Sequence, residues 1–187
     1  MVTQAFIRAV PWDDQRAANA RALRRELGEA TIVWDSERHA YETFIDALRF
    51  AASGPAIHLE DDAALTSAFR AKAEAVIAAR PESVIQMFSR RAPDLTRGSR
   101  AEAGGGFSYT LAFYVPARLA GPLADFAPTW EGRALHRTGT DLAIAALLAG
   151  RGESYWLTVP SLVQHRVWKS AIDPRRARDR TSRTFRP

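Results

Sequence analysis

Four short apolar runs alternate with stretches of helical periodicity through the first half of the chain. The runs are rich in Ile, Val, Phe and Ala, and they occupy residues 5–10, 31–35, 56–60 and 83–88. After the second run, Tyr41, Phe44, Ile45 and Leu48 follow the i, i+3, i+4, i+7 spacing of an amphipathic helix. Strands that alternate with helices are joined by right-handed crossovers, so the pattern predicts an α/β fold with a mostly parallel central sheet and helices on both faces.

The same periodicities, together with Gly and Pro breakers, predict the remaining elements. We expect a first helix over residues 15–27 and a third helix whose apolar face carries Leu65, Phe69, Ala73, Val76 and Ile77. In the less regular second half, the expected elements are a strand within 107–116, helices over 117–126 and 138–149, and one or two strands within 155–165. The glycine-rich segment 97–106 is predicted to be a mobile loop over a ligand site.

Three consecutive carboxylates, Glu60, Asp61 and Asp62, follow the third apolar run. The carboxyl ends of parallel strands form the ligand site of α/β sheets, so segments 11–14, 35–39 and 60–62 should meet in one crevice. Carboxylates suit a hard cation such as Mg²⁺ or Mn²⁺, which can neutralise a diphosphate. Alternatively, Asp61 or Asp62 caps the next helix without any metal. Only one acid can cap, however, and the others repel unless something positive is bound.

The composition describes one folded domain of 187 residues, 47% of them hydrophobic and 25% charged. Cysteine is absent, which excludes disulfides, thiol catalysis and Cys-ligated zinc. No run of roughly 18 apolar residues could span a membrane, and the N-terminal residues do not have the pattern of a secretory signal. We therefore expect a cytoplasmic protein without a membrane partner.

Basic residues gather at the C-terminus. Residues 168–187 contain seven Lys or Arg and two Asp, which accounts for the net charge of +5, so the rest of the chain is neutral. We divide the chain into a domain of residues 1–168 and an Arg-rich tail of residues 169–187. The tail is either a solvated extension, a contact for DNA phosphates or a ligand for a diphosphate, since guanidinium groups bind phosphate well.

Several further segments accompany the acidic motif in a fixed order: Trp34–Leu48 precedes it, and Thr138–Ile144 and Val159–His165 follow it. This order, over residues 5–168, resembles the nucleotide-sugar glycosyltransferases with the GT-A fold. It is similar to small glycosyltransferases encoded by phages, some of which modify hydroxymethylated pyrimidines in DNA. The resemblance implies a single GT-A-like domain that transfers a sugar from a nucleotide diphosphate, with a UDP-sugar as the expected donor, to a hydroxyl group.

The resemblance also assigns the metal ligands. In the family the last acid of the motif usually binds Mn²⁺ or Mg²⁺, which implies that role for Asp62. Glu60 or Asp61 would then contact the ribose or a metal-bound water. His165 matches a late histidine that completes the metal shell or contacts phosphate in several members, and its alternative is a histidine satisfied by hydrogen bonds at a strand end.

Donor-binding residues are implied in the same way. Asp35, at the end of the second apolar run, matches a position that commonly contacts the nucleoside. Val10 and Pro11 are expected to line the base pocket, and Arg38 is counted among the residues that bind the donor.

Asp141 is the expected catalytic base. Inversion at an anomeric carbon needs a carboxylate to accept the proton of the acceptor hydroxyl, and related inverting enzymes place one at the start of a late helix. The alternative is structural, because Thr138-Gly-Thr-Asp141 also fits a helix capping box.

Two other functions could explain acids beside a basic tail. A metal-dependent nuclease is disfavoured, because neither Lys72 nor Lys169 follows an acid at the acid-x-Lys spacing. A non-catalytic nucleic-acid-binding module would leave the three acids without a role, and no reader motif is present. A glycosyltransferase is therefore the preferred interpretation, with hydroxymethylated DNA as the favoured acceptor and a non-DNA glycan or small molecule as the alternative.

Overall fold

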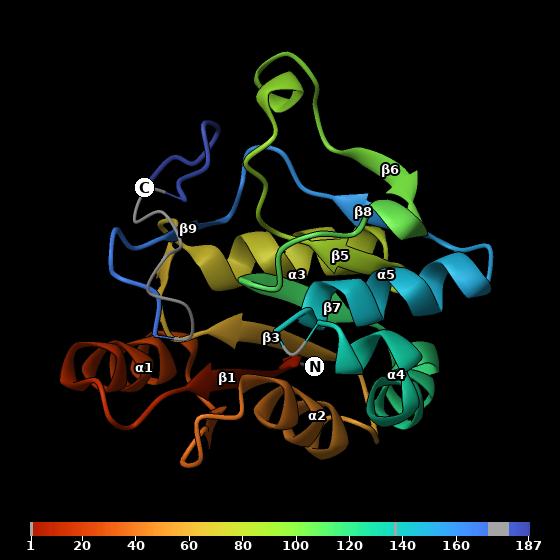
Figure 1. Ribbon diagram of the computed structural model, residues 1–187. Coiled ribbons are helices and arrows are strands. Elements are labelled where there is room, and N and C mark those ends of the chain that lie inside the picture. Colours follow the sequence, from red (N-terminus) through yellow and green to blue (C-terminus); the bar gives the residue numbers. More distant parts are fainter. Residues whose placement is uncertain (1, 137, 172–179) are drawn as a thin grey trace.

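The computed structural model describes residues 2–136, 138–171 and 180–187. Within them, seven strands form a central sheet and helices cover both of its faces (Figure 1). The helices are α1 (Asp14–Leu27), α2 (Ala40–Phe50), α3 (Phe69–Ala79), α4 (Ala117–Thr129) and α5 (Thr140–Gly150). The strands of the central sheet are β1 (Gln4–Ala9), β2 (Ala30–Trp34), β3 (Ala56–Glu60), β5 (Val84–Gln86), β6 (Arg100–Ala103), β7 (Ala112–Val115) and β8 (Ser154–Leu157). Short 3₁₀ helices are η1 (Ala92–Leu95), η2 (Gly104–Gly106) and η3 (Glu131–Ala134).

The central sheet is mixed, in the order β2-β1-β3-β7-β5-β8-β6. β1 pairs in parallel with β2 and β3, and β5 pairs in parallel with β8. β7 runs antiparallel to both β3 and β5, so these two strands share a direction although they are not neighbours. β6 runs antiparallel to β8 at the sheet edge. The prediction of an α/β domain with a mostly parallel sheet is confirmed at that level, and β7 and β6 are the exceptions.

A separate two-stranded antiparallel sheet joins β4 (Ala63–Leu65) to β9 (Val163–His165). Residues 63–65 are therefore a strand, and the prediction that Leu65 belongs to a helix is wrong. α3 begins only at Phe69, because Ala68 adopts a left-handed conformation with φ of 53° and ends the preceding turn. β4 is thus an additional strand between β3 and α3, and the chain returns to the central sheet at β5.

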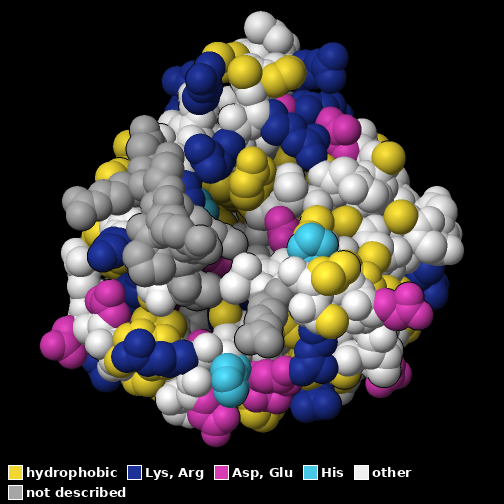
Figure 2. All heavy atoms as spheres, in the orientation of Figure 1, with side chains coloured by type: hydrophobic (Ala, Val, Ile, Leu, Met, Phe, Trp, Pro, Cys, Tyr) yellow, Lys and Arg dark blue, Asp and Glu magenta, His cyan; other side chains and the backbone are white. Residues whose placement is uncertain are grey.

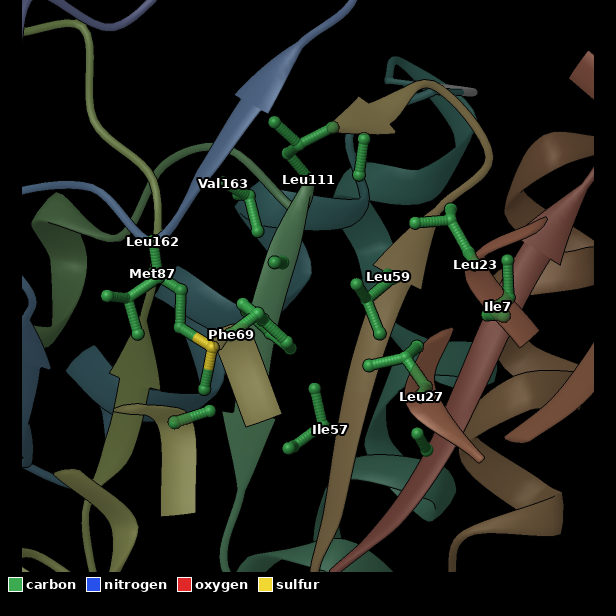
Figure 3. Packing of buried hydrophobic residues seen from close by; sticks show 14 of the residues in the cluster. Ile7, Leu23, Leu27, Ile57, Leu59, Phe69, Met87, Leu111, Leu162 and Val163 are labelled. Carbon is green, nitrogen blue, oxygen red and sulfur yellow. The ribbon is translucent and has the colours of Figure 1, made fainter. Parts of the chain in front are cut away.

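Among the described residues, two large hydrophobic cores lie on opposite faces of the central sheet, and a smaller cluster contains Phe6, Val33, Ala47, Ala51 and Ala56. The first includes side chains of α1 and α3, and the second includes side chains of α2, α4 and α5. Figure 3 shows part of the first core, where Ile7 and Ile57 of the sheet face the same interior as Leu23, Leu27 and Phe69 from the helices. Each such buried aliphatic or aromatic side chain stabilises the fold by about 1.5–3 kcal/mol.

Successive side chains of a strand point to opposite faces of the sheet. Ile7 packs in the first core, whereas Phe6 and Arg8 lie on the other face. On that face the ring of His58 stacks between Phe6 and Phe113, with centroid distances of 5.7 and 4.9 Å. The guanidinium group of Arg8 lies above the Phe113 ring, 6.0 Å from its centroid. A charged side chain thus reaches the interior from the middle of the sheet.

The glycine-rich segment is not a mobile loop over a ligand site. Residues 100–103 form the edge strand β6, and Gly104–Gly106 form η2, which packs against α5. Gly104 is buried, and a Cβ atom there would lie only 2.4 Å from the carbonyl oxygen of Glu153 and from Cβ of Leu148. The glycine therefore permits close packing of η2 against α5.

Of the basic tail, residues 169–171 and 180–187 are described, whereas Arg175, Arg176 and Arg178 lie outside the described residues. The segment 180–187 is held against the body of the protein through Ser182, which is only 8% exposed. Among the helices that the structure describes, none has the length and apolar character needed to cross a membrane.

Candidate functional site

The carboxyl ends of β1, β2 and β3 border a cavity of about 370 Å³. Five acidic residues line it: Asp35, Glu60, Asp61, Asp62 and Asp141. The positively charged residues around it are Arg8, Arg16, Arg90 and Arg180, and His165 is also in the wall. The segments after β2 and β3 meet at this cavity as predicted, through Asp35 and the acidic motif 60–62, whereas residues 11–14 do not line it. Among the described residues, four arginines join these acids in the wall.

Asp62 lies in the wall of this cavity and is only 2% exposed. Three nitrogen atoms surround its Oδ2 atom: Nη2 of Arg180 at 3.0 Å, Nη2 of Arg16 at 3.1 Å and Nδ1 of His165 at 3.3 Å. Burial alone would raise the pKa of Asp62, but its contact with His165 and the charges of His165, Arg16 and Arg180 lower that pKa far below its ordinary value. Asp62 is therefore a carboxylate whose negative charge is neutralised by its neighbours.

The small β4–β9 sheet brings His165 to Asp62. Ala63, which follows Asp62 directly, lies opposite His165 in the antiparallel register. The two residues that the sequence assigned to a metal site are therefore neighbours, although they come from opposite halves of the chain.

The donor set around Asp62 fits a divalent cation that a ligand would complete. Oδ1 of Asp62 is buried and accepts no hydrogen bond from any described residue, and Nδ1 of His165 is likewise buried without a hydrogen-bond partner among them. Across the described part of the chain, no three His, Asp or Glu side chains gather as a metal cage. Mg²⁺ is usually held by only one or two carboxylates together with phosphate oxygens and water. Asp62 agrees with that kind of site as its carboxylate, and His165 would add a nitrogen ligand.

Asp61 stabilises the turn that carries Asp62. Nη1 of Arg16 lies 2.5 Å from its Oδ1, and the backbone N–H of Val10 donates to its Oδ2 over 2.9 Å. The side-chain amide of Asn19 donates to the carbonyl oxygens of Asp61 and Ala63. Burial raises the pKa of Asp61 to about 6, even though the charge of Arg16 acts in the opposite direction. Both of its oxygens are used, so its role is to position the motif.

Neither acid caps a helix, so the alternative interpretation of the motif is wrong. β4 follows Asp62 directly, and the N-cap residue of α3 is Ala68, which makes no side-chain capping hydrogen bond. The negative charges of Asp61 and Asp62 are therefore not stabilised by the N-terminus of α3. They are neutralised by Arg16 and Arg180 instead.

Glu60 is linked to the opposite wall of the cavity. Its Oε1 accepts hydrogen bonds from Nη2 of Arg8 at 3.1 Å and from the hydroxyl of Thr110 at 2.8 Å. Arg8 also donates to the carbonyl oxygen of Thr110 over 2.8 Å, and Oγ1 of Thr110 lies 2.8 Å from Oγ1 of Thr140. Burial lowers the pKa of Arg8, and the charges of Glu60 and Asp61 oppose that effect. This network joins β1, β3 and the start of α5.

The residues predicted to bind a nucleoside are only partly brought together. Asp35 is 5% exposed, lines the cavity and accepts the backbone N–H of His39 on Oδ1. Val10 lines the cavity too, whereas Pro11 is exposed beyond the strand end and does not. Arg38 has a left-handed backbone, with φ of 61°, and its guanidinium group lies over the Trp12 ring, 4.9 Å from the ring centroid. Pro11 and Arg38 therefore do not line this cavity, although Arg38 lines the adjoining one.

Asp141 lies in the first turn of α5 and faces the cavity. The N-cap residue is Gly139, and α5 begins at Thr140, so the capping box predicted from Thr138 is not formed. Instead, Oδ2 of Asp141 accepts the backbone N–H of Tyr109 at 3.3 Å. Tyr109 has a positive φ of 71°, a conformation that large side chains rarely adopt and that is often found at functional sites.

Sequence reasoning missed Arg8, Arg16 and Thr110. Arg8 had a signal, because it is a charged residue inside an otherwise apolar strand. Arg16 had none, since it is one of several arginines along α1 and only the packing shows that it is buried. Thr110 lies in an irregular segment before β7, so no periodicity could single it out.

A second cavity, of about 660 Å³, adjoins the first through Ala40 and Thr138, which line both. Trp130 and Tyr41 supply aromatic surface to its wall, beside charged residues of both signs. Those charged residues are Arg38, Arg133, Glu42 and Glu131. Arg133 forms an ion pair with Glu42 and stacks over the ring of Tyr41.

Comparison with known proteins indicates a shared fold. No protein-family model and no curated protein sequence matches the chain. Among solved structures, the chain is similar to A197 from STIV, with a TM-score of 0.54 and 12% sequence identity over 88% of this chain and 84% of that one. At this identity the likeness concerns the fold alone.

Proposed function

We propose that this protein is a metal-dependent glycosyltransferase with a GT-A-like fold, which transfers a sugar from a nucleotide diphosphate to a hydroxyl group. The observation that carries the proposal is the pairing of Asp62 with His165 at the end of β3, where Oδ1 of Asp62 is buried without a hydrogen-bond donor among the described residues. The neighbouring cavity is also lined by Asp35 and Asp141, which supply further carboxylates at separate places in its wall.

Asp62 and His165 would hold the divalent cation, and Asp35 would accept hydrogen bonds from the nucleoside with the oxygen that His39 leaves available. The chemistry that such a cation supplies when bound is neutralisation of the charge on a departing diphosphate. Arg16 keeps the two carboxylates of the motif in place, because it donates to both Asp61 and Asp62.

Asp141 would act as the base. In the proposed reaction the acceptor oxygen bonds to the anomeric carbon, the bond from that carbon to the diphosphate oxygen breaks, and the acceptor proton passes to Asp141. A positioned carboxylate of this kind typically contributes a factor of about 10² to 10⁴ in rate. The hydrogen bond from Tyr109 fixes the orientation of the carboxylate.

The favoured acceptor is a hydroxymethylated pyrimidine in DNA. Dark blue Lys and Arg side chains gather at the top of the face in Figure 2, over the region where Figure 1 places η1 and β6. That region carries the exposed residues Arg90 and Arg97. It also carries Arg91, which forms an ion pair with Glu102, and Arg100, which forms ion pairs with Asp94 and Glu102. Such a basic surface suits DNA phosphates, and a target base would have to leave the duplex to meet the sugar.

A neutral glycan or small molecule is the second candidate acceptor. The observation that favours it is the mixed charge of the second cavity, where two arginines face two glutamates beside Trp130. A cavity of this composition suits an uncharged ligand with several hydroxyl groups better than a polyanion.

Thermal unfolding with Mn²⁺, UDP-glucose and DNA, each alone and together, tests the proposal. UDP-glucose should raise the melting temperature only when Mn²⁺ is present, because a ligand that binds only the folded state stabilises it. Asp62→Asn should abolish that shift, whereas Asp46→Asn, which changes an exposed acid of α2, should keep it. A UDP-glucose shift that persists without metal, or in Asp62→Asn, would contradict the metal site. Stabilisation by DNA, with none by UDP-glucose and Mn²⁺ together, would favour a nucleic-acid-binding module.

A further inference from the structure

The end of the chain is fastened next to the candidate metal site. We call residues 180–187 the C-terminal strap. The backbone N–H of Ser182 donates to Oε1 of Gln164 at 2.6 Å, and Nε2 of Gln164 donates to the carbonyl oxygen of Ser182 at 3.2 Å. One side chain of β9 therefore satisfies both backbone groups of a strap residue, much as a neighbouring strand would.

Further hydrogen bonds hold the strap on both sides of Gln164. The hydroxyl groups of Ser182 and Ser161 lie 2.9 Å apart, and Oγ1 of Thr184 accepts the backbone N–H of Ser161 at 3.1 Å. Near the end of the chain, the hydroxyl of Thr66 donates to the carbonyl oxygen of Arg186 at 2.6 Å. Hydrogen bonds thus hold the strap in place, and most of them are made by residues that do not line the cavity.

The first residue of the strap reaches the metal site. Arg180 is 13% exposed, and its Nη2 atom lies 3.0 Å from Oδ2 of Asp62. Gln164 and His165 are consecutive in β9, and the side chains of consecutive strand residues point to opposite sides. Gln164 holds the strap while His165 approaches Asp62, so the same short strand supports both.

Arg16 and Arg180 are not equivalent partners of Asp62. Arg16 also forms a 2.5 Å ion pair with Asp61 and donates to the carbonyl oxygen of Lys169, so it is fixed at several points. Arg180 arrives from a segment near the chain end. A divalent cation at Asp62 would lie beside the positive charge of Arg180, and like charges at such short range repel each other strongly where little water is present.

We propose that Arg180 is an exchangeable counter-ion, and that the C-terminal strap and a divalent cation compete for Asp62. With the strap docked, Arg180 neutralises the carboxylate in place of the metal. Cation binding expels Arg180 and loosens the strap, and by linkage strap docking lowers cation affinity by the same factor. This inference rests on the metal site of the proposed function and adds a regulatory contact to it.

Calorimetric titration of the full chain with Mn²⁺ alone tests the competition. Arg180→Ala should bind Mn²⁺ about fivefold or more tightly than the unmodified protein, the usual range of coupling between two sites. Gln164→Ala should act in the same direction, because it releases the strap without altering Asp62. The matched control is Arg183→Ala, which removes an exposed charge of the same strap and should change the affinity less than about twofold. Unchanged or weaker Mn²⁺ binding in Arg180→Ala would overturn the proposal.

Hydrogen exchange at the Ser182 amide separates this inference from the proposed function. Addition of Mn²⁺ should speed exchange of that amide in the unmodified protein, because its hydrogen bond to Gln164 is lost when the strap leaves. If Mn²⁺ binds and the amide stays equally protected, the proposed displacement of Arg180 by the cation is wrong, but the metal site is not contradicted. If Mn²⁺ binds neither the unmodified protein nor Arg180→Ala, the metal site and the competition both fail.

Discussion

Arg16 and Asp61 form a buried ion pair of 2.5 Å between the first turn of α1 and the end of β3. Burial alone would lower the pKa of Arg16, but the charges of Asp62 and Asp61 outweigh that effect and raise it. The pair therefore stays ionised inside the protein and fastens α1 to the acidic motif. Its loss would leave carboxylates without their main positive partner.

Replacement of this arginine should be strongly destabilising. In Arg16→Met, Asp61 and Asp62 remain buried without Arg16, so we expect the free energy of unfolding to fall by about 3–5 kcal/mol, measured by urea denaturation at pH 7. Arg25→Met changes an exposed residue of the same helix and should cost less than about 0.5 kcal/mol. A loss in Arg16→Met no larger than that in Arg25→Met would show that the pair does not hold α1 in place.

Substitution of Asp141 should separate catalysis from binding. Asp141→Asn keeps the size of the side chain and an oxygen that can accept the Tyr109 N–H, but it cannot accept a proton at neutral pH. We expect kcat for sugar transfer to fall by about 10² to 10⁴, with the affinity for UDP in the presence of Mn²⁺ unchanged. Asp125→Asn, on the exposed side of α4, should keep full activity. Full activity in Asp141→Asn would instead assign Asp141 to the structure of the α5 turn.

His58 should make the fold sensitive to acid. Burial, with a smaller contribution from the charge of Arg8, lowers its pKa from 6.5 to about 3. Between these pH values the unfolded chain binds a proton that the folded chain does not, so the free energy of unfolding falls as the pH decreases. The contribution of His58 is roughly 1 kcal/mol per pH unit from pH 6.5 to pH 3, with none above pH 6.5. Asp61 opposes this effect below pH 6, because its raised pKa of about 6 makes the folded chain bind a proton more readily than the unfolded chain.

Urea denaturation at several pH values between 4 and 8 measures this slope. His58→Leu replaces the imidazole by an apolar group between Phe6 and Phe113, so the contribution of His58 should be lost. The free energy of unfolding should then fall less, or rise, as the pH decreases from 6.5 to 4. His39→Leu, at an exposed position, is the control and should retain the slope of the unmodified protein. Identical slopes in His58→Leu and the unmodified protein would mean that other groups cause the acid sensitivity.

A methyl group at Gly104 should disrupt the contact between η2 and α5. Its Cβ would lie 2.4 Å from both the carbonyl oxygen of Glu153 and Cβ of Leu148, and the backbone there cannot move freely. Gly104→Ala is therefore expected to lower the free energy of unfolding by about 1–3 kcal/mol, detected as a lower melting temperature. Gly98→Ala, where a Cβ meets open space, should leave it nearly unchanged. Equal melting temperatures for the two variants would contradict the packing described for η2.

Much of the secondary structure was predictable because it depends on the spacing of neighbouring side chains. The runs at 5–10, 31–35 and 56–60 are strands within one residue of the expected limits, and the helical spacing after Tyr41 is α2. Leu65 was assigned to the wrong element, since a short strand that pairs with a distant segment has no local signature. β6 was missed because three of its neighbours are glycines, whose sequence signal resembles that of a loop.

The candidate site was predictable only where it depends on a single strand end. Asp35, Glu60, Asp61 and Asp62 follow buried strands, so the parallel sheet brings them to one edge. Pro11 and Arg38 also come after strand ends, but neither lines this cavity, since a position beyond a strand end does not by itself fix where the side chain lies.

The sequence by itself determined most of the segments that form helices and strands, except β4 and β6, and which end of the sheet collects the acids, because both follow from periodicity and chain direction. Only the tertiary structure decided that β7 separates β3 from β5, that His165 lies beside Asp62, and that Arg16 and Arg180 neutralise the buried carboxylates. These are contacts between distant parts of the chain. Their partners are selected by which charges must be buried together in the folded core, and that requirement leaves no pattern in the local sequence.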